Sequence, residues 1–122
     1  MSSTVNRPGL QIDAAAHEVS VVRITVPTAP AGDTVFSIFQ DVYHLVDQEK
    51  RRKLVLDFSK VRVLNSAMLA FLLGLNQKIT LAGGRLAVCH LSPEARNFFA
   101  SFPRPLIHIY EDEPQALASF PS

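Results

Sequence analysis

The hydrophobic and polar positions of this chain follow two periods, and each change of period marks a new element. Residues 19–26 (VSVVRITV) alternate with a period of two, which is typical of a strand, and residues 54–58 (LVLDF) are almost entirely apolar, as in a central parallel strand. Between them, apolar residues recur at helical spacing over residues 33–47, behind an N-cap at Asp33. A second and more apolar helix is predicted over residues 66–81.

The rest of the chain continues the alternation of strands and helices. Further strands are predicted over 10–12, 86–89 and 107–110, and shorter helices start at Ser92 and Asp112. This order predicts an α/β fold with a mixed, mainly parallel central sheet of about five strands, an amino-terminal antiparallel hairpin and about four helices. We expect residues 1–9 to form a flexible arm and residues 10–122 to form one domain.

Composition then excludes several classes of protein. Hydrophobic residues make up 48% of the 122 residues and charged residues 19%, which is typical of a globular domain. No apolar run approaches the roughly 20 residues of a membrane span, and the amino terminus lacks an apolar signal core, so we expect no direct membrane insertion. The single cysteine, Cys89, cannot form an internal disulfide, which predicts a reducing compartment, the cytoplasm.

Charge gives no indication of a nucleic-acid partner. The net charge is only +1, and the longest basic run, residues 50–53, lies in a predicted connection between a helix and a strand. A solvated turn explains this run, because no aromatic residues are interleaved with it and no nucleic-acid-binding motif accompanies it.

The chain contains no recognisable catalytic motif. Ser66 stands at a strand-to-helix elbow, but the sequence around it is not Gly-x-Ser-x-Gly, so its simplest role is an N-cap. Asp57 ends a strand and either faces solvent or pairs with Lys60. Phosphate-binding glycine loops are missing as well. We therefore expect no enzyme activity and no cofactor.

The histidines and the cysteine do not have the spacing of a metal site. Cys89 and His90 are neighbours, and neighbouring residues of a strand point to opposite faces, so they are not expected to share a ligand. A buried Cys89 that packs as a small hydrophobic residue is the simpler interpretation. We expect no metal.

The helix that starts at Ser66 carries more apolar residues than one buried face needs. If residues 69, 72, 73 and 79 face the sheet, an adjoining apolar stripe remains, formed by Met68, Phe71 and Leu75. Such a stripe beside a polar elbow predicts a docking surface for another protein. The alternative is that the third helix or the amino-terminal arm covers it.

Several motifs in this order resemble one known family. They are Asp57-Phe58-Ser59 at the end of a strand, an apolar pair before Asn65-Ser66-Ala67-Met68, the return at Gly83-Gly84, a Ser-Pro helix start at residues 92–93 and an acidic stretch at residues 111–113. With these motifs the chain resembles the STAS domain, which anti-sigma factor antagonists and sulfate transporters share. The resemblance covers nearly the whole chain.

The resemblance implies a phosphorylation switch that this sequence lacks. Such antagonists carry Asp-Ser-Ser-Gly at the helix start, and a partner that is both anti-sigma factor and kinase phosphorylates the second serine. The added phosphate, about −1.5 to −2 charges, opposes binding. Here the corresponding residues are Asn65, Ser66, Ala67 and Met68, so the acceptor hydroxyl is missing.

The resemblance therefore implies a non-catalytic binding module for an anti-sigma factor or kinase-type partner, without the usual serine phosphoswitch. An alternative is a structural STAS subunit of a larger assembly, either a signalling complex or a lipid-transport ABC system, and a homodimer stays open. A small hydrolase or transferase is disfavoured, because no nucleophile–base pair emerges. The predicted partner-binding surface comprises Gly32, Asp33, Thr34, Met68, Phe71 and Leu75, beside the switch region Asn65, Ser66 and Ala67.

Overall fold

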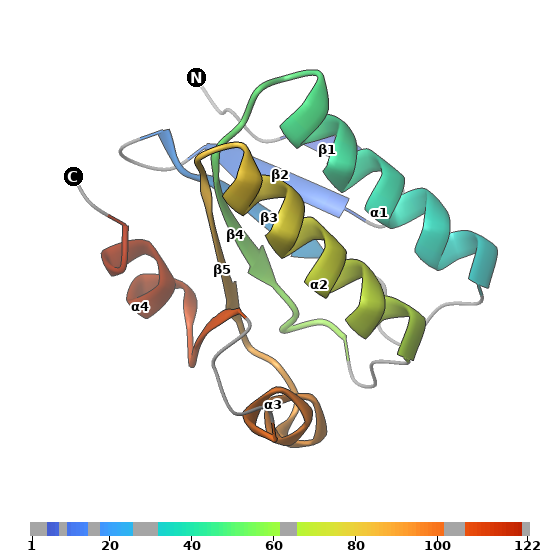
Figure 1. Ribbon diagram of the computed structural model, residues 1–122, viewed down its shortest axis with the longest axis vertical. Coiled ribbons are helices and arrows are strands. Elements are labelled where there is room, and N and C mark those ends of the chain that lie inside the picture. The colour runs from blue at the N-terminus through green and yellow to red at the C-terminus, as the bar shows by residue number, and fades with distance from the viewer. Residues whose placement is uncertain are drawn as a thin grey trace.

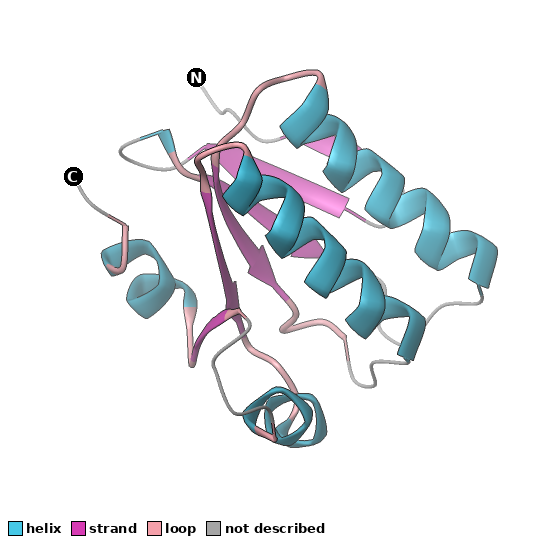
Figure 2. Ribbon diagram, in the orientation of Figure 1, coloured by secondary structure: helices cyan, strands magenta, loops and turns pink. Residues whose placement is uncertain are grey.

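A single mixed sheet forms the centre of the computed structural model, which describes residues 5–7, 10–14, 18–25, 32–61, 66–101 and 107–120, the side chains of 5–7, 32–36 and 66 excepted. Within these residues the sheet has six strands, and their spatial order follows the chain (Figures 1 and 2). The strands are β1 (Val5–Arg7), β2 (Leu10–Ala14), β3 (Ser20–Ile24), β4 (Lys53–Asp57), β5 (Arg85–Cys89) and β6 (His108–Tyr110). β1, β2 and β3 are antiparallel neighbours, whereas β3 to β6 run parallel to one another.

Helices connect the parallel strands and cover the two faces of the sheet unequally. In the described part of the chain they are α1 (Gly32–Asp47), α2 (Ser66–Leu81), α3 (Pro93–Ala100) and α4 (Glu113–Ala118). α1 and α2 lie side by side on one face, and α4 lies on the other (Figure 1). The predicted fold class, a mainly parallel mixed sheet with four helices, is confirmed.

Of the expected amino-terminal arm, residues 1–9, only residues 5–7 lie within the described part of the chain. Val5–Arg7 forms an additional strand that pairs with β2, Val5 opposite Ile12 and Arg7 opposite Leu10. This strand could not be predicted, because three residues are too few to establish a period of alternation. The neighbouring strand β2 supplies hydrogen-bond partners for the backbone N–H and C=O groups of this short segment.

Two apolar clusters hold the layers together. Successive residues of a strand point to opposite faces, so Leu54 and Leu56 of β4 contact the layer of α1 and α2, while Val55 contacts the layer of α4. All three side chains are completely buried. This explains the continuous apolar run of β4, which has one helical layer on each side.

The connection from α2 to β5 needs both of its glycines. Gly83 has a φ of 84°, the left-handed conformation expected of a residue that ends a helix. A Cβ on Gly84 would lie 2.2 Å from the carbonyl oxygen of Arg52. That oxygen also accepts a 2.7 Å hydrogen bond from the amide of Arg85. The close approach fixes the start of β5 against the residue that precedes β4.

The two short helices have the predicted caps. The Ser92 hydroxyl accepts a 3.3 Å hydrogen bond from the amide of Ala95, and Asp112 Oδ1 accepts one of 2.9 Å from the amide of Gln115. Gln115 also reaches backwards, but its Oε1 accepts from the amide of Glu111 rather than from that of Asp112. The cap of α4 matters for the site, because it places Glu113 at the edge of the sheet.

Candidate functional site

The helices α1 and α2 begin at the same end of the molecule, the carboxyl edge of the parallel strands. Each helix follows a parallel strand and runs back along it, so both amino termini lie where β3 and β4 end (Figure 1). Gly32, Asp33 and Thr34 form the first turn of α1, and Ser66 and Ala67 begin α2. Asn65 and the side chains of the first turn of α1 and of Ser66 lie outside the described residues.

The predicted apolar docking stripe on α2 is wrong. Met68 and Leu75 are completely buried, and Phe71 packs half-buried against the same core. The cause is a misplaced helix phase: the inward residues are Met68, Leu72, Leu75 and Ile79, whereas Leu69 and Leu73, assigned to the sheet, are only partly buried. The observed inward residues are four, three and four positions apart. This spacing fits one face of a helix as well as the spacing of the residues that we assigned to the sheet.

Among the described residues, helix α1 contacts Phe71 and covers part of its ring. The rings of Phe71 and Phe39 are stacked at 5.1 Å between centroids, and the ring of Tyr43 lies 6.2 Å away. Tyr43 also donates a 3.2 Å hydrogen bond from its hydroxyl to the carbonyl of Phe71. A Cβ on Gly74 would lie 2.9 Å from the same hydroxyl, so the small residue permits this close contact.

Between residues 67 and 77, the exposed residues of α2 are small or polar, whereas Leu81 at the end of the helix is an exposed apolar residue. Ala67, Ala70 and Gln77 are exposed and Gly74 is partly exposed, and their spacing of three, four and three residues places them on one line. We call these four residues the outer line of α2. A partner that approaches the helix start meets this shallow line, because the bulky apolar residues face inward.

A charged cluster occupies the same edge of the sheet beneath α4. Arg23 of β3 holds Glu113 of α4 with two 2.8 Å hydrogen bonds, from Nε and from an Nη atom, and it also binds Asp13 of β2. Its Nε lies 3.8 Å from Oδ2 of Asp57, the last residue of β4. The guanidinium therefore connects three carboxylates from three elements.

Asp57 is the central member of this charged cluster. Its side chain is buried, its Oδ1 accepts a 2.7 Å hydrogen bond from the amide of Ser59, and it is hydrogen-bonded to Glu113. It therefore does not face solvent, and no ion pair with Lys60 occurs among the described residues, so neither predicted environment is found. Ser59 is exposed at the start of the segment that leads to α2.

The pKa values of Asp57 and Glu113 shift in opposite directions. Burial acts to raise the pKa of Asp57, but the hydrogen bonds from Glu113 and Ser59 outweigh it and hold that pKa below its usual value. Burial raises the pKa of Glu113, and the hydrogen bond to Asp57 raises it further against the effect of Arg23. The hydrogen bond between the two side chains therefore acts on their pKa values in opposite directions. The hydrogen bond to Glu113 raises the pKa of Arg23, which stays charged.

A second group of side chains at this edge includes metal-ligand types. One ligand atom each of Asp57, Cys89 and His90 lie within 4.8 Å of one another. Burial raises the pKa of the Cys89 thiol to about 12, and the nearby carboxylate of Asp57 acts in the same direction. Strand alternation predicts that Cys89 and His90 point apart, and no sequence motif indicates a role for Arg23 or Glu113. The signal for Arg23 was its place as the one cation within an apolar strand.

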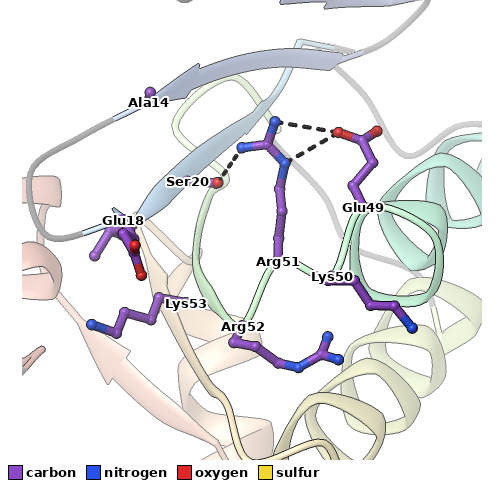
Figure 3. A pocket seen from close by; sticks show the side chains of 9 residues that line it. Ala14, Glu18, Ser20, Glu49, Lys50, Arg51, Arg52 and Lys53 are labelled. Atoms are coloured by element: carbon purple, nitrogen blue, oxygen red, sulfur yellow. Dashed lines mark hydrogen bonds and ion pairs between the residues drawn. The ribbon is translucent and has the colours of Figure 1, made fainter.

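The basic run at the opposite edge of the sheet has structural contacts. It borders a cleft of about 410 Å³ at the amino ends of β3 and β4. Arg51 donates a 2.7 Å hydrogen bond to the Ser20 hydroxyl and two of 3.3 Å to Glu49, as Figure 3 shows. Arg52 donates to the carbonyl of Val46 at 2.9 Å. The predicted solvated turn applies to Lys50, which is exposed, whereas the two arginines anchor the loop to α1 and β3.

Among the described residues, no helix combines the length and the apolar character that crossing a membrane requires.

Comparison with known proteins identifies one family. The STAS domain family matches residues 18–116. No curated protein matches the chain in sequence. Among solved structures, the anti-sigma factor antagonist SpoIIAA of Bacillus in its unphosphorylated form matches with a TM-score of 0.70 and 16% identity over 89% of this chain and 94% of that chain.

Two further solved structures extend the comparison. A serine-to-glutamate variant of RsbS from Moorella thermoacetica matches with a TM-score of 0.73 and 14% identity, over 89% of this chain and 92% of that chain. The murine anion transporter Slc26a9 in its inward-facing state matches with a TM-score of 0.66 and 16% identity over 87% of this chain, which corresponds to 18% of the transporter chain. At these identities, the matches establish a common fold.

Proposed function

Since the chain belongs to the STAS domain family, we propose that it is a non-catalytic binding module of the anti-sigma factor antagonist type. Its partner would be an anti-sigma factor or a kinase-type protein, which contacts the start of α2. The observation that carries this proposal is the family match over residues 18–116 together with the fold likeness to the antagonist SpoIIAA. The single cysteine is buried and free, which suits a reducing compartment such as the cytoplasm.

The binding surface that we propose differs from the one predicted from sequence. Met68 and Leu75 hold the core together, so a partner would contact Ala67 and Ala70 of the outer line, with the first turn of α1 beside them. Small side chains let a partner's backbone come close to the helix. The backbone N–H groups of the first turn of α2 lack partners within the helix and suit a polar or acidic partner group.

We further propose that binding is independent of serine phosphorylation. The resemblance implies an acceptor hydroxyl at the position of Ala67, and an alanine there carries no oxygen. Ala67 is exposed, so a kinase that docks at this helix would meet a methyl group. The module would then bind constitutively or answer to another signal.

The binding test uses matched alanine-to-arginine variants. We would titrate the purified chain into each recombinant anti-sigma factor kinase encoded in the source genome, and follow the heat of binding. Ala67→Arg adds a long cation at the proposed contact and should weaken binding at least about tenfold, or about 1.4 kcal/mol. Ala118→Arg, on an exposed position of α4 across the sheet, is the control and should bind as the wild type does. Equal affinities for the two variants would contradict the proposed surface.

The phosphorylation test uses the kinase that binds. Incubation with ATP should leave the wild type unmodified by mass spectrometry, whereas Ala67→Ser should gain one phosphate, because it restores the hydroxyl that the resemblance implies. Stoichiometric phosphate on Ser66 of the wild type would contradict a binder without the serine switch.

A second candidate function is a structural subunit of a larger assembly. It is favoured by the match to Slc26a9, in which the shared fold accounts for only 18% of the chain, and by two exposed apolar residues, Leu81 at 80% and Phe98 at 40% exposure. Light scattering after size-exclusion chromatography would distinguish the two functions. A stable homo-oligomer that Leu81→Lys or Phe98→Lys dissociates would favour the assembly subunit.

A further inference from the structure

Three side chains with different donor atoms meet at the carboxyl edge of the sheet. Asp57 ends β4, Cys89 ends the adjacent β5, and His90 follows directly. An oxygen, a sulfur and a nitrogen atom from these residues lie within 4.8 Å of one another. The register of the two parallel strands produces this meeting, because Asp57 and Cys89 are opposite each other.

His90 joins this group because the backbone turns at that residue. In a regular strand, its side chain would point away from that of Cys89. Instead, His90 has a φ of 60°, the left-handed conformation that glycine adopts without strain and that most other residues avoid. The turn ends the alternation of β5 and leaves the imidazole near the thiol and the carboxylate.

The surroundings of the thiol favour a cation. The Cys89 side chain is completely buried, and no hydrogen bond to its sulfur is found among the described residues. Three carboxylates, those of Asp13, Asp57 and Glu113, stand around this edge against the one guanidinium of Arg23. The excess of negative charge attracts a dication, and the dication would displace the thiol proton as it binds.

We propose that Asp57, Cys89 and His90 bind a divalent, thiol-preferring cation of the Zn²⁺ class. Thiolate, imidazole and carboxylate are the three ligand types that zinc takes in proteins, and a tetrahedral ion places its ligand atoms about 3.3–3.8 Å apart. The atoms here already lie within 4.8 Å, and the exposed imidazole of His90 is free to close the difference. As the metal–sulfur bond forms, the thiol proton passes to solvent, and a water molecule completes the coordination.

The competing interpretation is that Cys89 packs only as a small apolar residue. Cys89 does belong to the apolar cluster beneath α4. That role explains its burial, but it explains neither the left-handed turn that brings a histidine beside it nor the nearby carboxylate. The two interpretations differ in a measurable way, because only the first gives a metal–sulfur bond.

The experiment uses the full chain, reduced and freed of metal with a chelator that is then removed. Zinc chloride should bind with a stoichiometry of one per chain by isothermal titration calorimetry. Cobalt chloride should produce a thiolate-to-metal charge-transfer band in the near ultraviolet, together with the visible bands of a tetrahedral Co²⁺ site. Zinc should then abolish the cobalt spectrum. Absence of the charge-transfer band would overturn the proposal, whatever the calorimetry gives.

Matched variants assign the ligands. His90→Gln changes an exposed residue and should weaken zinc binding at least about tenfold, as should Cys89→Ala, which should also remove the charge-transfer band. His44→Gln, on an exposed position of α1, is the control and should leave both measurements unchanged. Circular dichroism of the metal-free proteins establishes that each variant folds. Undiminished zinc binding by folded His90→Gln would overturn the ligand set, and loss in His44→Gln would do the same.

Discussion

The two faces of the sheet are built from different interactions. Beneath α1 and α2, the core cluster includes Leu54, Met68 and Leu72, each completely buried. Beneath α4, a small apolar cluster borders a network of charges in which Arg23 connects three carboxylates. The first face is held together by many apolar contacts that do not require a particular orientation. The second depends on a few hydrogen bonds and ion pairs that do. We therefore expect substitutions on the first to act mainly on stability, and those on the second to act on local geometry and pH response.

The largest effect should come from a charge in the apolar face. Met68→Asp places a carboxylate where the wild-type side chain has no exposure, so the charged group would lose its contact with water. The expected loss is about 4 kcal/mol or more, enough to unfold a marginally stable domain. Chemical denaturation followed by circular dichroism measures it. Leu81→Asp, at an 80% exposed position of the same helix, should stay within about 0.5 kcal/mol. A folded Met68→Asp protein would mean that α2 does not pack as described.

This contrast explains what periodicity could and could not predict. The sequence predicted α2, its length and its glycine stop correctly, because local spacing and turn chemistry determine them. It misassigned the inward face, since almost every residue from Ala67 to Leu75 is apolar or small and several phases fit equally well. Only the position of α1, with Phe39 stacked on Phe71, decides between those phases, and that contact links helices separated by β4.

The next largest effect should come from the charged face. Arg23→Met removes the partner of Glu113 and Asp13 and leaves their carboxylates near that of Asp57 without the guanidinium. Because Arg23 is 29% exposed in its side chain, water screens part of the loss, and about 1–3 kcal/mol is expected. Thermal unfolding in the presence of EDTA measures it without a contribution from metal.

A second arginine variant separates geometry from charge. Arg23→Lys keeps the positive charge but cannot form the paired hydrogen bonds to Glu113, so it should recover only part of the lost stability. Full recovery would mean that charge alone matters on this face, and the distinction between the two faces would weaken.

The charged face was beyond sequence reasoning for a physical reason. Arg23 and Glu113 are 90 residues apart in the chain, and no local pattern links β3 to α4. The parts could be read separately: Asp57 was placed at a strand end and Asp112 at a helix cap, and both placements are confirmed. Arg23, Asp57 and Glu113 come together because the strand order brings the ends of β3, β4 and β5 to one edge of the sheet. The left-handed turn at His90 could not be predicted, because only a small minority of residues other than glycine adopt this conformation.

A smaller effect should come from the ring contact between α1 and α2. Phe71→Leu keeps an apolar side chain but loses the stacking on Phe39 at 5.1 Å, for an expected loss of about 0.5–1.5 kcal/mol. The double variant Phe39→Leu/Phe71→Leu should then lose less than the sum of the single losses, because both remove the same contact. Strict additivity in urea denaturation would indicate that the rings contribute only their buried area.

The smallest effect, and the one specific to the charged face, is a pH dependence that Phe71→Leu should not alter. The pKa of Asp57 is lower in the folded protein than the ordinary aspartate value of 3.8, so its ionised form stabilises the fold above that value, and the contribution is lost as the pH falls below it. Asp57→Asn keeps an acceptor for the Ser59 amide but cannot titrate. The free energy of unfolding of wild type should therefore exceed that of Asp57→Asn near neutral pH, and the gap should narrow as the pH falls below 3.8, with EDTA present throughout. A gap that does not narrow below that pH would mean that the folded protein does not favour the ionised form of Asp57.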